Sequence, residues 1–114
     1  MKIIVTAQGN DLNAPVSPTF ARCPYFLVVD TETNAVVPVV NKSMREPKGA
    51  GIAAAQFVLS QKVDAVVTNK MGPKAFRVLQ VAGVPVYSVT PMTVGGAVNE
   101  FNAGKLLPIK VPSI

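Results

Sequence analysis

Residues 25–40, YFLVVDTETNAVVPVV, decide the fold of this chain. Two apolar runs, 25–29 and 35–40, flank a polar turn, and this pattern is typical of a β-hairpin. Pro38 interrupts the second run. Because proline donates no backbone hydrogen bond, it is tolerated mainly at the edge of a sheet. The hairpin therefore predicts that the second run is an edge strand.

Three further apolar runs extend the predicted sheet. Residues 3–5 and 65–67 are continuously apolar, as expected for strands that are buried on both faces. Residues 84–87 contain Pro85 near their start, so this strand also suits an edge. The two proline-bearing strands therefore take the edges of the sheet, and the two continuous runs take its centre.

Three amphipathic helices are expected over 49–60, 73–83 and 93–104, where apolar residues recur at helical spacing. Thr93 can cap the third helix, and Gly83 suits the position just past the end of the second. Right-handed crossovers make the last three strands parallel. The predicted fold is α/β and ribonuclease H-like, with a five-stranded mixed sheet of order 3-2-1-4-5, an antiparallel strand 2 and three flanking helices.

Length and composition set the organisation of the chain. Its 114 residues suffice for one domain, which we place at 1–104, followed by an extended tail over 105–114. Hydrophobic residues make up 49% of the chain, enough to form a core. The apolar run at the N-terminus is too short for a signal peptide or a membrane span, so we expect a cytoplasmic protein with no membrane association.

The residue inventory excludes several chemistries. The chain has no histidine, so it cannot build a Ser-His-Asp or Cys-His catalytic unit or a His-bearing zinc site. Its one cysteine, Cys23, excludes an internal disulfide and an all-cysteine metal site within one chain. The net charge of +5 favours an anionic partner.

The predicted topology collects four loops, 8–24, 41–51, 68–74 and 90–96, at one edge of the sheet, which we call the basic edge. All three predicted helices begin there, and their free N–H groups favour an anion. The acids at this edge are Asp11 and Glu46. The basic residues at this edge are Arg22, Lys42, Arg45, Lys48, Lys70 and Lys74.

Cys23 and several glycines complete the predicted site. A thiol beside several cations should have a lowered pKa and be available as a ligand. Glycines would let a ligand approach the backbone closely. Each feature also has a purely structural reading, as a solvated charge, a turn or a small buried apolar residue. The candidate binding residues are Arg22, Cys23, Lys48, Gly49, Gly51, Lys70, Gly72 and Lys74.

Four motifs, in order along the chain, resemble a known family. They are FARCPYFLVVD over 20–30, GAGIAAAQ over 49–56, VDAVV over 63–67 and GPKAF over 72–76. Together they resemble the NifX-like domains of the dinitrogenase iron–molybdenum cofactor biosynthesis family, over nearly the whole chain. The resemblance implies a ribonuclease H-like fold and a non-catalytic protein that binds or carries an iron–sulfur or iron–molybdenum cluster. Its partners would be metal-cluster donor or acceptor proteins.

The chain departs from this family at two positions. Many members carry histidine where this chain has Thr19 and Lys48. Cys23 is therefore the only soft donor that the chain can offer a metal–sulfur cluster, and we predict that it is the metal ligand. With one thiolate per chain, much of the affinity must come from the cations, and we expect a monomer or weak dimer.

Two other functions are compatible with such a fold. A metal-dependent nuclease needs clustered carboxylates, but residues 2–7 hold none, and Asp30 and Asp64 fall at the opposite edge of the predicted sheet. A module that binds a small anion or a nucleic acid without metal is the stronger alternative, because the basic edge permits it. Aromatic residues make up only 6% of the chain, which makes nucleic acid an unlikely partner.

Overall fold

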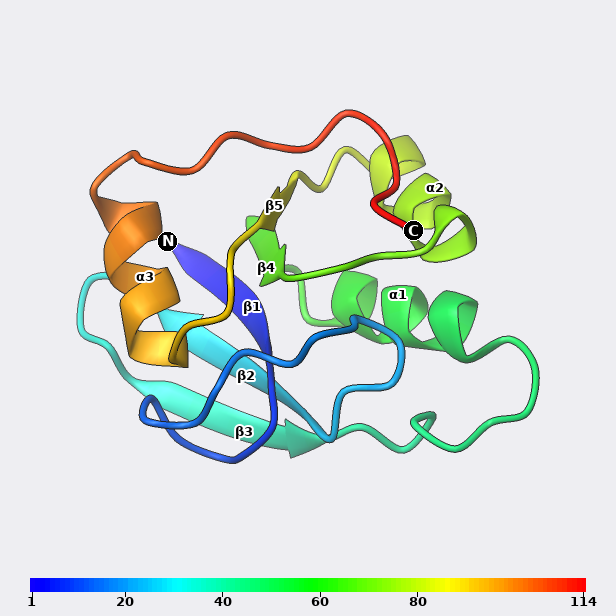
Figure 1. Ribbon diagram of the computed structural model, residues 1–114, viewed down its shortest axis with the longest axis horizontal. Coiled ribbons are helices and arrows are strands. Elements are labelled where there is room, and N and C mark those ends of the chain that lie inside the picture. The colour runs from blue at the N-terminus through cyan, green and yellow to red at the C-terminus, as the bar shows by residue number, and fades with distance from the viewer.

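Five strands form one mixed sheet in the order β3-β2-β1-β4-β5, and a computed structural model describes all 114 residues (Figure 1). β2 is antiparallel to both β1 and β3, whereas β4 is parallel to β1 and to β5. The predicted strand order and directions are confirmed. The strands are β1 (Lys2–Ala7), β2 (Tyr25–Asp30), β3 (Val36–Val40), β4 (Ala65–Thr68) and β5 (Val86–Ser88).

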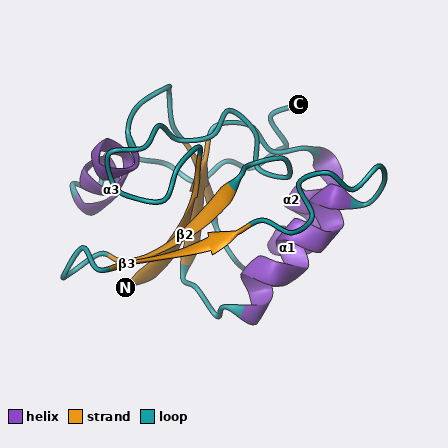
Figure 2. Ribbon diagram, turned by 90° about the horizontal axis from the view of Figure 1, so that it is seen from below, coloured by secondary structure: helices purple, strands orange, loops and turns teal.

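The three helices cover both faces of the sheet. Helices α1 (Ala50–Ser60) and α2 (Pro73–Val81) pack on one face, and α3 (Val94–Asn102) packs on the other (Figure 2). Ile3 contributes to the core beneath α3 and Ile4 to the core beneath α1 and α2, so β1 is buried on both faces as predicted. No helix is long and apolar enough to cross a membrane.

The predicted helix ends agree with the structure. Thr93 caps α3, because its Oγ1 accepts a hydrogen bond from the Gly96 N–H at 3.1 Å. Gly83 follows α2 with a φ of +77°, a conformation that glycine adopts without strain. The predicted strand 84–87 starts late, at Val86. Val84 donates its N–H to Leu79 at the end of α2 instead, and Pro85 has none to donate.

Both edges of the sheet are protected. β3 carries Pro38 and is an edge strand, as its sequence predicts. β5 forms the other edge, where Ile109 donates its N–H to the Val86 carbonyl at 2.8 Å and Pro108 pairs with Tyr87. From there, the extended tail runs along the molecule to the N-terminus of α2 (Figure 1). The tail therefore connects the edge strand β5 with the N-terminus of α2.

A buried pair of threonine hydroxyls joins the central strands. Thr6 of β1 and Thr68 of β4 are 0% and 1% exposed, and their Oγ1 atoms lie 2.7 Å apart. Valine has the shape of threonine but cannot form a hydrogen bond. A single replacement therefore leaves one hydroxyl buried without its partner, whereas a double replacement removes both polar groups.

We predict that Thr6→Val alone lowers the free energy of unfolding by about 1–3 kcal/mol. The double variant Thr6→Val/Thr68→Val should lie closer to the parent than either single variant. Urea denaturation of the four proteins measures this coupling. Additive losses in the double variant would show that the hydroxyl pair is not a coupled unit.

Candidate functional site

A cavity of about 370 Å³ opens between the N-termini of α1 and α2 and the loop that follows β1. We call it the basic cavity. Five of the predicted site residues line it, namely Arg22, Gly51, Lys70, Gly72 and Lys74. Thr19, Phe20, Ala21, Pro73, Ala75 and Ile114 complete the lining. The predicted residues Cys23, Lys48 and Gly49 lie outside it.

Parallel pairing of β1 and β4 creates the cavity. The two strands end at the same edge of the sheet, so the segments that follow them run side by side. Phe20 donates its N–H to the Lys70 carbonyl at 2.9 Å, and Thr19 forms a parallel bridge with Lys70. These bonds fix one wall of the cavity against the segment that leads into α2.

Two helix N-termini offer free hydrogen-bond donors at this place. The N–H groups of Gly51 in α1 and of Lys74 and Ala75 in α2 have no acceptor within the protein. All three residues line the cavity, and Ala75 is only 3% exposed. Free N–H groups and the positive end of each helix dipole favour an anion here.

The N-terminus of α3 does not contribute, which corrects the prediction that all three helices serve the site. Val94 donates its N–H to Ala14 at 2.9 Å, and Gly95 donates to Leu12 at 2.8 Å. Carbonyl groups of the loop after β1 thus occupy these donors, which are not free to bind a ligand.

The predicted glycines differ in what they do. A Cβ atom on Gly51 would lie 3.5 Å from the Ala75 Cβ atom, so a small residue here lets α1 and α2 approach each other beside the cavity. Gly49 has a φ of +77° and provides the turn into α1. Gly49 therefore serves the geometry of the cavity without lining it.

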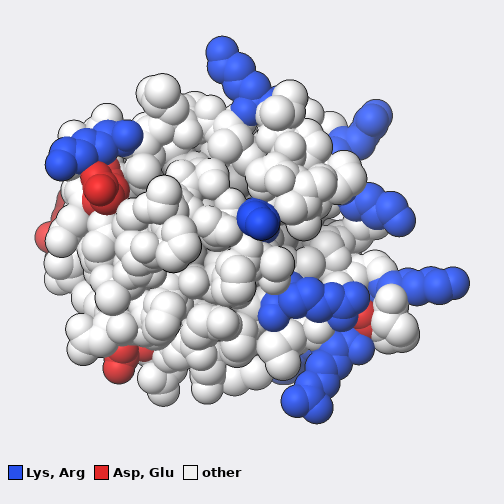
Figure 3. Space-filling model, in the orientation of Figure 1, with Lys and Arg blue, Asp and Glu red and all other residues white.

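The cations around the cavity have no carboxylate partners. The ion pairs of the protein join the Met1 amino group to Glu32 and Lys105 to Glu100, and neither involves Arg22, Lys48, Lys70 or Lys74. Lysines and arginines gather on one side of the molecule, over α1, α2 and the loop that precedes α1 (Figure 3). Their positive charge is therefore available to an incoming anion.

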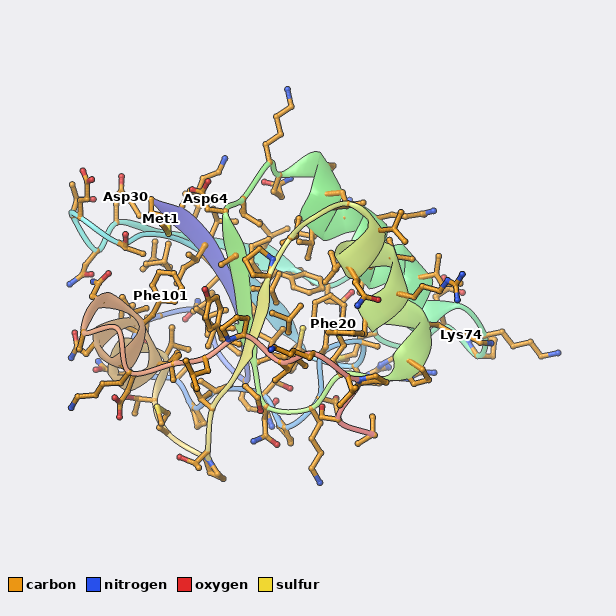
Figure 4. The ribbon with its side chains drawn as sticks, turned by 90° about the horizontal axis from the view of Figure 1, so that it is seen from above. Met1, Phe20, Asp30, Asp64, Lys74 and Phe101 are labelled. Atoms are coloured by element: carbon orange, nitrogen blue, oxygen red, sulfur yellow. The ribbon has the colours of Figure 1, made fainter.

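The carboxylates considered for a nuclease lie elsewhere. Asp30 and Asp64 sit beside Met1 at the start of β1, away from Lys74 and α2 (Figure 4). Asp64 accepts a hydrogen bond from the Lys2 N–H at 2.9 Å, and Asp30 from Glu32 at 2.9 Å. The hydrogen bond from the Glu32 N–H, with a further one from the Thr33 N–H, holds the pKa of Asp30 below its usual value. Both carboxylates therefore have structural partners.

Arg22 also organises the loop that carries Lys48. Its Nη1 donates to the Met44 carbonyl at 2.8 Å and to the Glu46 carbonyl at 2.6 Å. The guanidinium group keeps its charge while it holds residues 44–46 beside the cavity. Arg22 thus has both an electrostatic and a structural role at the basic edge.

Cys23 differs most from its predicted environment. It is 0% exposed and packs in the core with Phe20 and Phe26. Burial raises the pKa of the thiol to about 12, although a hydrogen bond from Asn41 opposes this shift. The prediction of an accessible thiol with a lowered pKa is therefore wrong. Ligation of a metal by Cys23 stays a prediction.

Asn41 is an organising residue that the sequence analysis missed. Its Nδ2 donates to the Ala21 carbonyl at 3.0 Å and to the Cys23 carbonyl at 2.9 Å, and its Oδ1 accepts from the Ser43 N–H. At 6% exposure it holds the loop of Cys23 against the end of β3. The one sequence feature that could have pointed to this role is an asparagine directly after a predicted strand, but asparagine is also common in ordinary turns.

Comparisons with known proteins agree along nearly the whole chain. The family model described as dinitrogenase iron-molybdenum cofactor matches residues 1–104. The apo form of the orange protein from Desulfovibrio gigas is 38% identical, with a TM-score of 0.94, and the match covers 99% of this chain and 96% of that one.

Two further relatives are more distant. A Thermotoga protein described as a NifB candidate is 34% identical, with a TM-score of 0.81, and the match covers 94% of this chain and 91% of that one. An uncharacterized protein from Methanocaldococcus jannaschii is 28% identical over an alignment of 109 residues, and the match covers 93% of this chain and 89% of the relative.

We predict that the Cys23 thiol is unreactive in the folded protein. Its pKa of about 12 against an ordinary 9.0 lowers the thiolate fraction near pH 8 about a thousandfold, and burial blocks access as well. Labelling by a disulfide reagent should be at least about a hundredfold slower than for the same protein in urea. Equal rates in the two states would contradict the burial of this residue.

The same pKa shift predicts a loss of stability in alkali. The unfolded thiol ionises near pH 9 and the folded thiol near pH 12, so the free energy of unfolding should fall as the pH rises through this interval. Cys23→Ala removes this contribution. Its unfolding should therefore depend less on pH between 9 and 12 than that of the parent.

Proposed function

This chain belongs to the dinitrogenase iron-molybdenum cofactor family, and on that premise we propose that it binds and carries an anionic metal–sulfur cluster in the basic cavity. The cluster is cargo, taken from one protein and delivered to another. One observation carries the proposal: Lys70, Lys74 and Arg22 surround a cavity that also presents free N–H groups from α1 and α2.

The donors in the cavity fit such a cargo. The sulfur atoms of an anionic cluster accept hydrogen bonds and attract positive charge, and the cavity supplies both. Lys70 and Lys74 are flexible and exposed, so they can follow a bulky anion. Lys48, in the loop that Arg22 holds, adds charge at a greater distance. Binding that depends on charge more than on covalent ligands allows a carrier to release its cargo.

The relatives support this proposal in two ways. The orange protein, whose chain matches this one almost throughout, has been solved in an apo form. The Thermotoga relative is described as a NifB candidate. Both therefore fit a family that handles a metal cofactor.

Further parts of the proposal follow from the same premise. We expect no catalytic activity, donor and acceptor proteins of the cluster as partners, a cytoplasmic location and a monomer or weak dimer. We also assign the domain, residues 1–104, to the ribonuclease H-like class, because the strand order 3-2-1-4-5 and the antiparallel β2 agree with it.

A phosphate-containing small molecule is the alternative cargo. Helix N-termini bind phosphate oxygens through the same kind of N–H group that Lys74 and Ala75 present. The two cargoes differ in their spectra, since a metal–sulfur cluster absorbs visible light by charge transfer and phosphate does not.

The decisive experiment is anaerobic purification followed by metal analysis and an absorption spectrum. We expect iron or molybdenum together with sulfide, and charge-transfer bands, either as isolated or after reconstitution with iron, sulfide and molybdate. Phosphate bound without metal would favour the alternative. A protein that takes up neither contradicts the proposed site.

We predict that the double variant Lys70→Gln/Lys74→Gln binds the reconstituted cluster about tenfold or more weakly than the parent, because two uncompensated cations are lost. Lys62→Gln is the matched control, because Lys62 is exposed just past the other end of α1. Raising the salt should also weaken binding, since screening acts over about 10 Å at 0.1 M. If the affinity changes neither with the Lys70→Gln/Lys74→Gln substitution nor with the salt concentration, the basic cavity is not the binding site.

Cys23→Ala tests the predicted thiolate ligand separately. The Cys23 sulfur lies in the core of the structure. Ligation of a metal would therefore require the loop that carries Cys23 to detach from Asn41. Because this variant removes the predicted ligand, we expect Cys23→Ala to bind the cluster more weakly than the parent, whereas an affinity within about threefold of the parent would show that the site is built on charge alone. Binding lost in Cys23→Ala but kept in Lys70→Gln/Lys74→Gln would instead establish Cys23 as the main ligand.

A further inference from the structure

We propose that the tail over 105–114 is a strap that closes the basic cavity and competes with the cargo for it. The proposal rests on the proposed function, because it concerns the regulation of that same site. Its basis is the contact of Ser113 and Ile114 with Met71 and Gly72, at the entrance to α2. The tail itself lies outside the matched family region, which ends at residue 104.

The strap reaches the cavity along a defined path. The tail leaves α3, contacts β5 through Pro108 and Ile109, and crosses to the N-terminus of α2 (Figure 1). Between these two attachments, Lys110, Val111 and Pro112 make no hydrogen bond to the rest of the protein, and Lys110 to Ile114 are all exposed. The tail is therefore held at two separate points.

Ser113 is the second attachment point. Its Oγ accepts a hydrogen bond from the Met71 N–H at 2.8 Å, and its own N–H donates to the Met71 carbonyl at 3.0 Å. Met71 directly precedes Gly72, the N-cap of α2, and Gly72 lines the basic cavity, so this attachment holds the end of the tail at the edge of the cavity. The attachment of Ser113 thus positions the next residue, Ile114, in the lining of the cavity.

Ile114, the residue after Ser113, lies at the basic cavity. It lines the basic cavity, and its Cγ1 would lie 3.9 Å from a Cβ atom placed on Gly72. Because Ile114 is 63% exposed, little apolar surface holds it there. A cargo that enters between Lys70 and Lys74 must share the cavity with this side chain or displace it.

Because of these contacts, the strap must open for the cargo to bind. If only molecules with a displaced strap accept the cluster, the apparent dissociation constant is the intrinsic one divided by the open fraction. The tail is held at Met71 by three hydrogen bonds, the longest of them 3.4 Å, few enough for a strongly bound anion to displace the strap. A partner protein that binds the tail would raise the open fraction and promote loading.

The test uses point variants of the full chain. Ser113→Pro removes the N–H of residue 113 together with its hydroxyl, and so breaks all three hydrogen bonds to Met71. Val111→Pro is the matched control, because it places proline in the same tail at a residue whose N–H donates no hydrogen bond. The probe is a thiolate-ligated synthetic iron–sulfur cluster, titrated anaerobically and followed by its absorption.

We expect Ser113→Pro to bind this probe about tenfold more tightly than the parent, and Val111→Pro to bind like the parent. In the cluster-free proteins, hydrogen exchange of the Met71 amide should be about tenfold faster in Ser113→Pro alone. In the parent, the probe should shift the amide resonances of Met71 and Ser113.

The failures of the two proposals can be told apart. Equal affinities in all three proteins, or a Met71 amide that exchanges equally fast in parent and variant, would overturn the strap and leave the cluster site intact. If no protein binds the probe, the proposed function fails and the strap fails with it.

Discussion

The parallel pairing of β1 with β4 is the constraint on which the rest of the structure depends. β1 has an antiparallel neighbour on its other side, so the chain direction changes across this one strand. Both strands then end at the same edge, and their loops cannot avoid each other there. The crossover through α1 and the connection through α2 place two helix N-termini beside these loops. The basic cavity is therefore a direct product of the topology.

Much of this fold could be predicted because its signals are local. Pro38 marks an edge strand, Thr93 caps a helix, and Gly83 ends one, each through a property of its own backbone or side chain. The charges of Arg22, Lys70 and Lys74 could be placed together because strand order alone brings their loops to one edge. Such inferences need no knowledge of side-chain packing.

The errors arose where a residue's environment depends on distant parts of the chain. Cys23 lies in a loop, but Asn41 holds that loop down and Phe20 and Phe26 cover the thiol. The N-terminus of α3 was expected at the same edge of the sheet as the other two, but the loop after β1 folds back and takes its donors. In both cases the deciding contact joins segments far apart along the chain, and no local pattern records it.

The burial of Cys23 has a consequence for the redox chemistry of the protein. A single cysteine can form a disulfide only with another molecule, and oxidants attack a thiolate that solvent can reach. This thiol is 0% exposed and stays protonated at neutral pH, because its pKa is about 12. The folded chain is therefore protected against oxidation that would link it covalently to a second copy or to a small thiol.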